Sequence, residues 1–444
     1  MKSTAAPCVN PPPQPGRWAQ AGRNAAILAV MRVAIMTAGS RGDVAPYTGL
    51  GRRLALAGHE VTLVTHARFE PLVAGSGVRF QGLPVDPRAE LESPRGRGLH
   101  RSASEAGKLL RLADMARRAV GQMTEDLLIA AQESEVLLLS ASLAPLGHTI
   151  AEGLRLPSMG VFLQPLAGTR EFAPPVLGGG SWGAAANRVA GHGVCLATEH
   201  IFMAAVPGVR SRLGLPAVRS GAALRARERR LWPVHHGFSP LVVPRPRDWR
   251  PGLTVSGYWW PYDMDSQLPG HVREFLDAGP PPVFVGLGSA TVPDAGRLSA
   301  RLVAALRRAG LRGVIQRGWA GLAAAGEDML AIDEVPHALL FPRMAAVVHH
   351  AGAGTTAAGL RAGVPAVPVP VQFDAGFWSA RLVALGVAPH VVPLRRLTVD
   401  ALASALLRAT REPAYRERAH RLGARIRDED GAAPVLAALD RLGG

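Results

Sequence analysis

The chain has 444 residues, 48% of them hydrophobic, which is enough for two or three domains with cores of ordinary size. Its formal net charge is +16, but almost all basic residues are arginines dispersed along helical patterns, and no basic stripe with interleaved aromatic residues indicates nucleic-acid binding. Two cysteines give no disulfide framework or CxxC metal motif, and no apolar run reaches the roughly 18 residues of a membrane span, so we expect a soluble, cytoplasmic protein without stable membrane insertion.

Residues 1–30 are rich in proline and polar residues and show no hydrophobic periodicity. This composition predicts a disordered N-terminal extension. Met31 stands directly before the first apolar run of strand length, residues 32–36. We therefore expect Met31 to be the natural start, which mass spectrometry of the native N-terminus would test.

Residues 31–240 alternate between strand-like apolar runs and helical patterns, which predicts one α/β domain. Its first unit is a strand at 33–36, a helix from about Pro46 to Ala57 and a strand at 61–65, and this βαβ order implies a parallel sheet. Two irregular stretches, 88–101 and 169–181, interrupt the alternation. Loops of that length are more often binding walls than spacers.

The alternation lapses over residues 241–282, where proline and aromatic residues gather, and we predict an interdomain linker there. A second alternating series occupies residues 283–444 and ends in several helices. Both halves are thus predicted to be doubly wound, Rossmann-like α/β domains. Because such sheets bind ligands at the carboxyl ends of their strands, two facing domains form a cleft.

The stretch HHAGAGTT, residues 349–356, joins a predicted buried strand at 344–348 to a helix that runs from about Thr355 and ends before Gly363. Gly352 and Gly354 would let a ligand approach the backbone. Thr355 and Thr356 are expected to present free amides at the positive end of the helix dipole. A histidine beside the turn adds a donor that is neutral or charged near pH 7. The turn predicts a phosphate site, although a tight packing turn would also use glycines.

Several stretches, in this order and spacing, resemble the nucleotide-sugar glycosyltransferases of the GT-B fold, in the group that includes sterol glucosyltransferases and macrolide and glycopeptide glycosyltransferases. The resemblance runs from Met31 nearly to the C-terminus. It is carried by AGSRGDVAPYTGLGRRLALAGHEVTLVTH, GFSPLVVPRPRDW, SGYWW, PPVFVGLGS, RGWAGL, VPHALLFPRMAAVVHHAGAG and AGVPAVPVPVQFDAGFW. It implies two facing Rossmann-like domains, with the acceptor held by the first and the nucleotide sugar by the second.

The resemblance also implies the residues that hold the donor. His350 matches the histidine that binds the donor diphosphate, and His349 is then a structural neighbour. The other positions expected at the diphosphate are Ser289, Gly352, Gly354, Thr355 and, from the opposite domain, Ser40. The nucleoside is expected at Val335, Pro336 and His337, with Trp319 nearby unless that side chain is a core aromatic.

Asp374 matches the acid that accepts hydrogen bonds from sugar hydroxyls, a task suited to an acceptor-only group. The family usually follows this acid with glutamine, whereas this chain has Ala375. One sugar contact is therefore expected to be missing, which is compatible with a deoxysugar donor. Asp43 matches the catalytic base, although aspartate at that place could instead cap the helix expected from Pro46.

The predicted function is inverting, metal-independent transfer of a sugar from a UDP- or dTDP-sugar to a hydroxyl of a small, largely apolar acceptor, without a cofactor. Asp263 and Asp265 have the spacing of a metal-binding DxD motif, but they fall in the predicted linker.

Two alternative functions stay open. One is a non-catalytic homologue that binds nucleotide sugar and assists another enzyme. The other is a dinucleotide-dependent oxidoreductase, since residues 352–357 satisfy the looser GxGxxA pattern, with Asp374 about 20 residues on.

Overall fold

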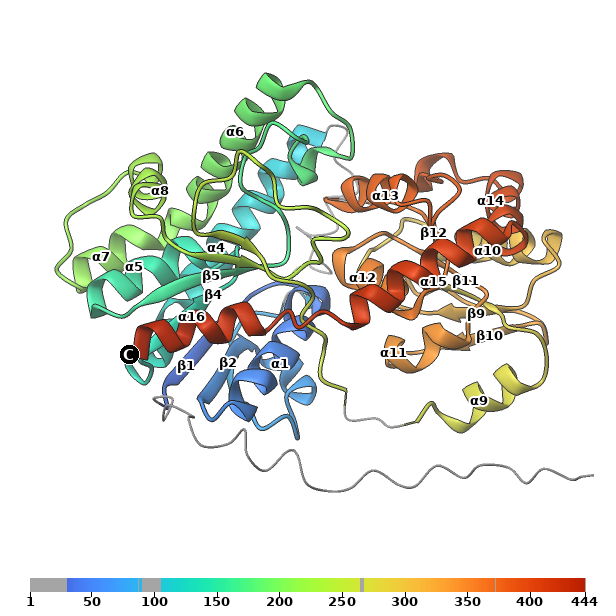
Figure 1. The fold of residues 1–444 in the computed structure, drawn as a ribbon, viewed down its shortest axis with the longest axis horizontal. Coiled ribbons are helices and arrows are strands. Elements are labelled where there is room, and N and C mark those ends of the chain that lie inside the picture. Colours follow the sequence, from blue (N-terminus) through green and yellow to red (C-terminus); the bar gives the residue numbers. More distant parts are fainter. Residues whose placement is uncertain (1–29, 87, 90–104, 264–266, 372, 444) are drawn as a thin grey trace, which may run out of the picture.

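Figure 1 shows a computed structural model in which two lobes lie side by side, each built on its own parallel sheet. The structure describes residues 30–86, 88–89, 105–263, 267–371 and 373–443. Residues 1–29 of the predicted disordered extension, and most of the irregular stretch 88–101, lie outside the described residues.

The first lobe contains a seven-stranded parallel sheet in the order β3-β2-β1-β4-β5-β6-β7. Its strands are β1 (Arg32–Met36), β2 (Glu60–His66), β3 (Arg79–Leu83), β4 (Val136–Leu139), β5 (Ser158–Phe162), β6 (Val234–His236) and β7 (Leu253–Val255). Beyond its first residue β1 is fully buried, as expected for a strand with helices on both faces of its sheet. β1 pairs in parallel with β2, which confirms the predicted βαβ unit.

The helices of this lobe are α1 (Arg41–Leu56), α4 (Glu105–Gln132), α5 (Ala144–Leu154), α6 (Ala184–Phe202), α7 (Val206–Arg212) and α8 (Ser220–Arg229), with the short 3-10 turns η1 (Ala67–Leu72), η2 (Pro175–Leu177) and η3 (Met203–Ala205). The predicted start of the first helix at Pro46 is wrong. α1 begins at Arg41 with Ser40 as its N-cap, and Pro46 lies inside it. Proline is favoured in the first turn of a helix, so the sequence predicts a helix start at Pro46, five residues after the observed start at Arg41.

The second lobe contains a five-stranded parallel sheet in the order β10-β9-β8-β11-β12. Its strands are β8 (Val283–Gly286), β9 (Gly313–Gln316), β10 (Met329–Ile332), β11 (Ala346–His349) and β12 (Ala366–Pro368). Its helices are α9 (Gly270–Asp277), α10 (Ala295–Arg308), α11 (His337–Leu340), α12 (Ala353–Ala362), α13 (Ala375–Ala384), α14 (Val399–Arg411) and α15 (Pro413–Arg427), with the 3-10 turns η4 (Phe341–Arg343) and η5 (Leu394–Arg396).

The stretch 241–282, predicted as a linker, contributes an element to each lobe. β7 pairs with β6 at the edge of the first sheet. Val272 and Leu276 of α9 pack in a core cluster with Phe284 of β8. Because β7 is three residues long and flanked by proline and aromatic residues, its pattern is too short to read from the sequence.

The last helix, α16 (Ala433–Gly443), also departs from the prediction, which placed all C-terminal helices in the second domain. Figure 1 shows that α15 lies in the second lobe and α16 in the first. Val435 and Leu439 are buried against Val33 and Leu63 of the first sheet. The returning chain also touches the outgoing one, since the Trp259 indole Nε1 donates to the Gly431 carbonyl at 2.8 Å.

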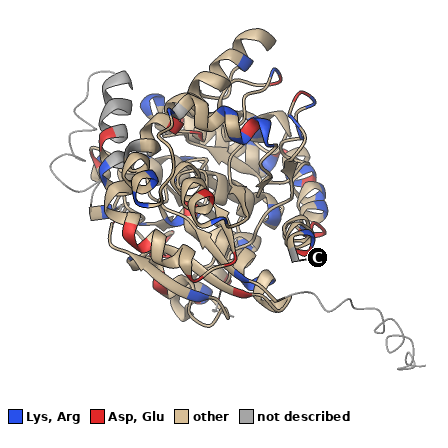
Figure 2. Cartoon of the chain, turned by 90° about the vertical axis from the view of Figure 1, so that its left-hand side faces the viewer, with Lys and Arg blue, Asp and Glu red and all other residues tan. Residues whose placement is uncertain are grey.

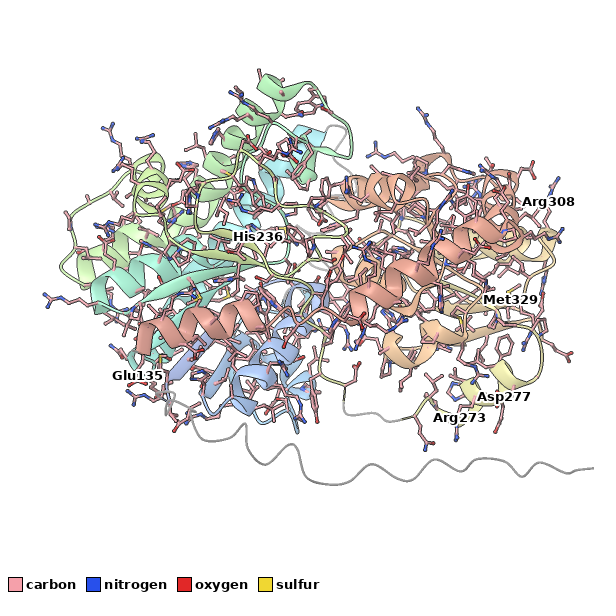
Figure 3. All side chains as sticks on the ribbon, in the orientation of Figure 1. Glu135, His236, Arg273, Asp277, Arg308 and Met329 are labelled. Carbon is pink, nitrogen blue, oxygen red and sulfur yellow. The ribbon has the colours of Figure 1, made fainter. Side chains whose placement is uncertain are left out.

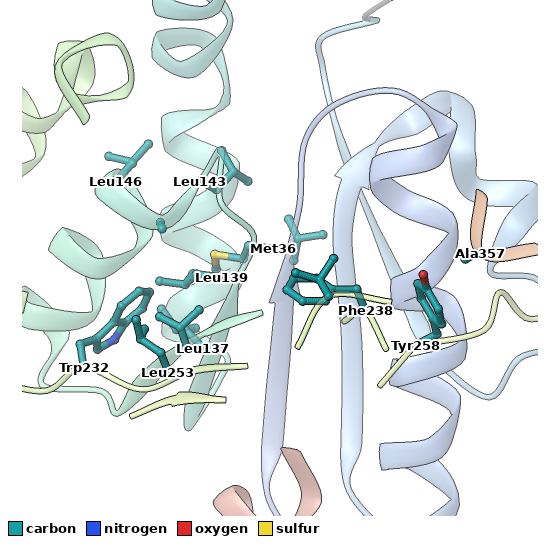
Figure 4. Close-up of a cluster of buried hydrophobic side chains, with 14 of the residues drawn as sticks. Met36, Leu137, Leu139, Leu143, Leu146, Trp232, Phe238, Leu253, Tyr258 and Ala357 are labelled. Carbon is teal, nitrogen blue, oxygen red and sulfur yellow. The ribbon is translucent and has the colours of Figure 1, made fainter. Parts of the chain in front are cut away.

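One apolar cluster runs across both lobes. Met36 and Leu139 of the first sheet, Phe238, Tyr258, and Ala357 of α12 belong to this cluster and are labelled in Figure 4. Ala357 is buried with 6% of its surface exposed. The lobes therefore share buried apolar surface as well as a linker.

Charged side chains lie on the outer surface of both lobes. Figure 2 shows basic and acidic residues mixed over many elements, and Figure 3 places Glu135, Asp277 and Arg308 at the outer surface. Each of these three forms a partly exposed ion pair, such as Arg308 with Asp400 at 2.6 Å. Exposed pairs of this kind contribute little to stability.

Within the described residues, no single helix has the length and apolar composition needed to cross a membrane. One bent pair, Ala184–Ile201 with Val206–Arg212, passes that test by length and composition only.

The docking of α16 can be tested by shortening a buried side chain. Leu439 is 0% exposed, so Leu439→Ala should lower the free energy of unfolding by about 2–5 kcal/mol through lost burial and the cavity left behind. Leu442, on the same helix, is 47% exposed, and Leu442→Ala should change it by no more than about 0.5 kcal/mol. Urea unfolding compares the two, and equal effects would show that α16 is not docked as described.

Candidate active site

The carboxyl ends of the strands in both sheets meet between the lobes. Arg41, at the start of α1, pairs with Glu334 after β10 at 2.8 Å, and the Arg68 guanidinium lies 5.5 Å from the centre of the Trp319 ring after β9. Both contacts join one lobe to the other across loops that follow strands. The predicted cleft therefore lies where doubly wound sheets bind their ligands.

A cavity of about 280 Å³ opens on the first-lobe side of this region. Its lining mixes hydroxyl and amide groups with a few apolar side chains: Thr37, Ala38, Asp43, Tyr47, Ser140, Ala141, Ser142, Leu163, Gln164 and Thr198. The only ionisable carboxylate in that lining is Asp43. A small molecule with a hydroxyl group would meet this carboxylate at the cavity wall.

The turn before α1 holds the Asp43 carboxylate in place. Asp43 Oδ2 accepts hydrogen bonds from the Ser40 amide at 2.8 Å and from the Ser40 hydroxyl at 3.0 Å. Asp43 therefore does take part in capping a helix. That helix is α1, whose N-cap is Ser40, and not a helix that begins at Pro46. Because the same side chain also lines the cavity, the capping and catalytic interpretations are compatible.

Burial raises the pKa of Asp43 above its ordinary value of 3.8, although hydrogen bonds from Ser40 and Gln164 lower it. A higher pKa makes the carboxylate a stronger base, which favours its removing a proton from an alcohol.

His66, which motif reasoning on the sequence did not single out, supports the same turn. It ends β2, is 3% exposed, and its Nε2 accepts a hydrogen bond from the Gly39 amide at 3.0 Å. Gly39 packs directly against the Asp43 carboxylate, since a Cβ built there would lie 2.5 Å from Asp43 Oδ2. Burial lowers the pKa of His66, so its Nε2 stays an acceptor near neutral pH.

On the second lobe, His350 follows β11 and is held between two glycines. A Cβ on Gly288 would lie 2.8 Å from its Cε1, and one on Gly352 would collide with its Nε2. Burial lowers the pKa of His350 to about 4. Of the two forms that the sequence left open, the imidazole is therefore the neutral one near pH 7 in this structure.

The turn after His350 leads into the N-terminus of α12. The helix begins at Ala353, two residues before the predicted start, and the Thr356 amide donates to the Gly352 carbonyl at 2.9 Å. The prediction that Thr356 offers a free amide is therefore wrong, and the free amides belong to residues 353–355. A Cβ on Gly354 would meet nothing within 4 Å, so the space above this turn is open.

His349 and Ser289 lie on either side of His350. His349 is 0% exposed, and its Nδ1 accepts from the Ala351 amide at 3.1 Å, which fits the predicted structural role. Ser289 is half-buried in the turn after β8, directly after the Gly288 that packs on His350. The glycine turns at Gly288 and Gly352 thus both pack against the His350 imidazole.

The residues predicted at the nucleoside line the next strand ends. Trp319 is half-buried between the lobes, with the Arg68 guanidinium near its ring, so it is not a core aromatic. Val335 is 9% exposed, which leaves mainly its backbone for a ligand. The His337 ring stacks on Phe341 with centroids 4.3 Å apart, and one face of it is therefore used in packing.

Asp374 is the N-cap residue of α13, and its Oδ2 accepts from the Trp378 indole Nε1 at 2.7 Å. Burial, with a further contribution from the charge of Asp43, raises the pKa of Asp374 to about 6. The two carboxylates thus interact electrostatically from opposite lobes. Phe373 before it has φ of 54°, a left-handed conformation that is unusual for a bulky residue.

Ala375 is 2% exposed and packs in the apolar cluster shared by the lobes. The missing sugar contact stays a prediction, and an Ala375→Gln variant with unchanged donor preference would count against it.

Among the described residues, no group of three or more His, Cys, Asp or Glu side chains could hold a metal ion. Asp263 of the DxD spacing is exposed in the connection between the lobes, and Asp265 lies outside the described residues.

Two family descriptions match separate parts of the chain. Residues 33–172 match the Glycosyltransferase family 28 N-terminal domain. Residues 313–439 match the Erythromycin biosynthesis protein CIII-like, C-terminal domain.

Curated relatives match nearly the whole chain. The O-mycaminosyltylonolide 6-deoxyallosyltransferase of Streptomyces fradiae is 36% identical over 408 residues, covering 90% of this chain and 95% of that protein. The chain belongs to this glycosyltransferase family. The sterol 3-beta-glucosyltransferase UGT80A2 of Arabidopsis thaliana is 31% identical over 438 residues, covering 92% of the glycosyltransferase described here but only 65% of the plant protein.

Solved structures agree on the architecture. The crystal structure of the glycosyltransferase of kitacinnamycin is 19% identical with a TM-score of 0.66, covering 93% of this glycosyltransferase and 99% of that chain. This confirms the predicted GT-B fold. Membership of the family also removes the oxidoreductase alternative, whereas the roles of individual site residues stay predictions.

The role of His66 can be tested through the pH dependence of turnover. His66→Ala removes the acceptor for the Gly39 amide, loosens the Ser40 turn and should lower kcat/KM by about 10- to 100-fold. Because the Ser40 hydrogen bonds lower the pKa of Asp43, weakening them should also move the acidic limb of the pH profile upward.

His66→Gln, which keeps an acceptor oxygen, should recover part of the rate. A loss of activity in His66→Ala with an unshifted pH profile would mean that His66 acts only on stability.

Proposed function

We propose that the protein is an inverting, metal-independent glycosyltransferase that moves a sugar from a UDP- or dTDP-sugar to a hydroxyl of a small, largely apolar acceptor. The observation that carries this proposal is the position of Asp43. Its carboxylate lines the first-lobe cavity, burial raises its pKa, and its charge raises the pKa of Asp374 in the second lobe.

In the proposed reaction, the acceptor hydroxyl lies in the cavity beside Asp43. As its oxygen attacks the anomeric carbon, the carboxylate takes the hydroxyl proton and the bond to the nucleotide diphosphate breaks. In a single displacement of this kind, the acceptor oxygen attacks the face of the carbon opposite the leaving diphosphate. The configuration at that carbon is therefore inverted.

The leaving diphosphate would be stabilised by the N-terminus of α12 and by His350. Three free amides, the helix dipole and an imidazole N–H are aimed at developing negative charge without a metal ion. Ser289 would contribute from the turn after β8, and Ser40 from the first lobe. Binding an anion would raise the pKa of His350 from about 4, which strengthens the interaction as charge grows.

Donor and acceptor classes are inferred from the relatives and the cavity. The names of two relatives describe a sterol 3-beta-glucosyltransferase and an O-mycaminosyltylonolide 6-deoxyallosyltransferase. The cavity offers Leu163 and the ring of Tyr47 to an apolar body and several hydroxyls to its polar groups. Ala375 favours a donor that lacks one hydroxyl, and Asp374 would hold the remaining ones.

The non-catalytic alternative is distinguished by turnover. Calorimetry with UDP and dTDP tests nucleotide binding, and a panel of hydroxylated apolar acceptors with UDP-glucose and dTDP-deoxysugars tests transfer. Asp43→Asn should lower transfer by about 100- to 10,000-fold while nucleotide binding is unchanged. Nucleotide binding without any transfer would favour the non-catalytic homologue.

The pH dependence follows from the Asp43 environment. The base must be ionised, and burial raises its pKa above 3.8, so kcat/KM should fall as pH drops through a midpoint above that value. An acidic midpoint at or below 3.8 would contradict the assignment of a buried base. Circular dichroism at each pH controls for unfolding.

The donor side is tested with His350→Gln. Loss of one hydrogen bond to a charged group, about 1.5–3 kcal/mol, should weaken nucleotide diphosphate binding by about 10- to 100-fold. His271→Gln is the matched control, because His271 is exposed on α9. Equal dissociation constants for the two variants by calorimetry would remove His350 from the diphosphate site.

A further inference from the structure

The second irregular stretch predicted from the sequence forms a strap, residues 169–182, that leaves the first lobe and returns to it. Asn187, which is 0% exposed, ties its two ends together, because Nδ2 donates to the Arg170 carbonyl at 3.2 Å and Oδ1 accepts from the Trp182 amide at 2.9 Å. Asp248 holds the beginning of the strap through the Thr169 hydroxyl at 2.6 Å. The ends are thus fixed to the first lobe.

The tip of the strap rests on the second lobe at the start of α13. It contains three successive glycines, residues 178–180, and Gly178 has φ of 105°. A Cβ on Gly179 would collide with the Gly376 carbonyl oxygen and lie 2.5 Å from the Ala380 Cβ. A Cβ on Gly376 would lie 3.1 Å from the Gly178 Cα. The two backbones touch because neither glycine carries a side chain.

Further contacts attach α13 to the first lobe. The Phe377 ring lies 5.2 Å from Phe172 of the strap, and the Arg381 side chain donates through Nε to the Val242 carbonyl at 2.8 Å. Ala375 is 2% exposed in the cluster to which these rings belong. Residues of the first lobe therefore contact α13 along two successive turns, at Gly376 and Phe377 and again at Ala380 and Arg381.

Asp374 is the N-cap of this helix, and Trp378, which donates to its carboxylate, lies one turn further on. We propose that the strap is a positioning element for the sugar site, in which the contact between Gly179 and Gly376 holds the N-terminus of α13, and with it Asp374, against the acceptor lobe. The inference rests on the proposed function, since it concerns the sugar of the donor. The sugar site thus takes Asp374 from the second lobe and the strap that positions it from the first lobe.

This arrangement separates two parts of the donor. The diphosphate is expected at His350 and α12, whereas the sugar is expected at Asp374, at the start of the helix α13 on which the tip of the strap rests. Loosening the strap should therefore weaken recognition of the whole nucleotide sugar and leave the affinity for the free nucleotide diphosphate unchanged. Water should also reach the anomeric carbon more easily, because that wall of the site would no longer be closed.

The test compares Gly179→Ala with Gly180→Ala. The added methyl collides at 179, whereas at 180 a Cβ would meet nothing within 4 Å, so the second variant is a matched control. Gly179→Ala should raise the donor KM on the order of tenfold and increase donor hydrolysis relative to transfer, with an unchanged dissociation constant for UDP or dTDP. Phe172→Ala, which removes the ring contact with Phe377, should act in the same direction.

Hydrogen exchange of residues 373–380 without ligand supplies a readout that does not depend on activity. It should be faster in Gly179→Ala and Phe172→Ala than in the wild type and in Gly180→Ala. If the wild type transfers no sugar, the proposed function fails, while faster exchange would still establish the contact between strap and helix. The inference is overturned if Gly179→Ala matches Gly180→Ala in exchange, donor KM and hydrolysis, or if nucleotide diphosphate affinity falls in parallel with donor KM.

Discussion

The electrostatic interaction between two carboxylates on opposite lobes, Asp43 and Asp374, sets the conditions for the rest of the site. Burial raises the pKa of both Asp43 and Asp374, and the negative charge of Asp43 raises that of Asp374 further. Bringing these groups together is unfavourable unless other interactions offset their repulsion and loss of water. The Ser40 turn, the Trp378 indole, the shared apolar cluster and the contacts of α13 supply those interactions. A sugar whose hydroxyls donate to Asp374 would relieve part of the remaining cost.

The chemistry of each half follows from where its strands end. On the first lobe a short turn aims one carboxylate into a cavity with many hydroxyls, and a neutral histidine behind it holds the turn by accepting a backbone hydrogen bond. On the second lobe two glycine turns enclose another neutral histidine beside a helix N-terminus. Each lobe thus presents a buried, uncharged imidazole beside the group that would change charge in the proposed reaction.

Much of this arrangement could be predicted from the sequence, because the alternation of strands and helices and the glycine turn carry strong local signals. The predictions failed where the signal was short or nonlocal. β7 has three residues, α1 contains a proline that suggests a later start, and α16 packs on strands nearly 400 positions earlier in the chain. The role of His66 depends on a contact with Gly39, 27 residues away, which no spacing rule reveals. The neutrality of His350 depends on burial, which the sequence does not report.

The chain passes between the lobes twice, once before α9 and once before α16, and the two passages lie against each other through Trp259 and Gly431. Two adjacent connections between rigid bodies resist relative twisting more than bending about the axis through them. Cutting a single connection with a protease would leave the lobes tethered by the other. Any separation of the lobes would therefore return Asp43 and Asp374 to the same relative position.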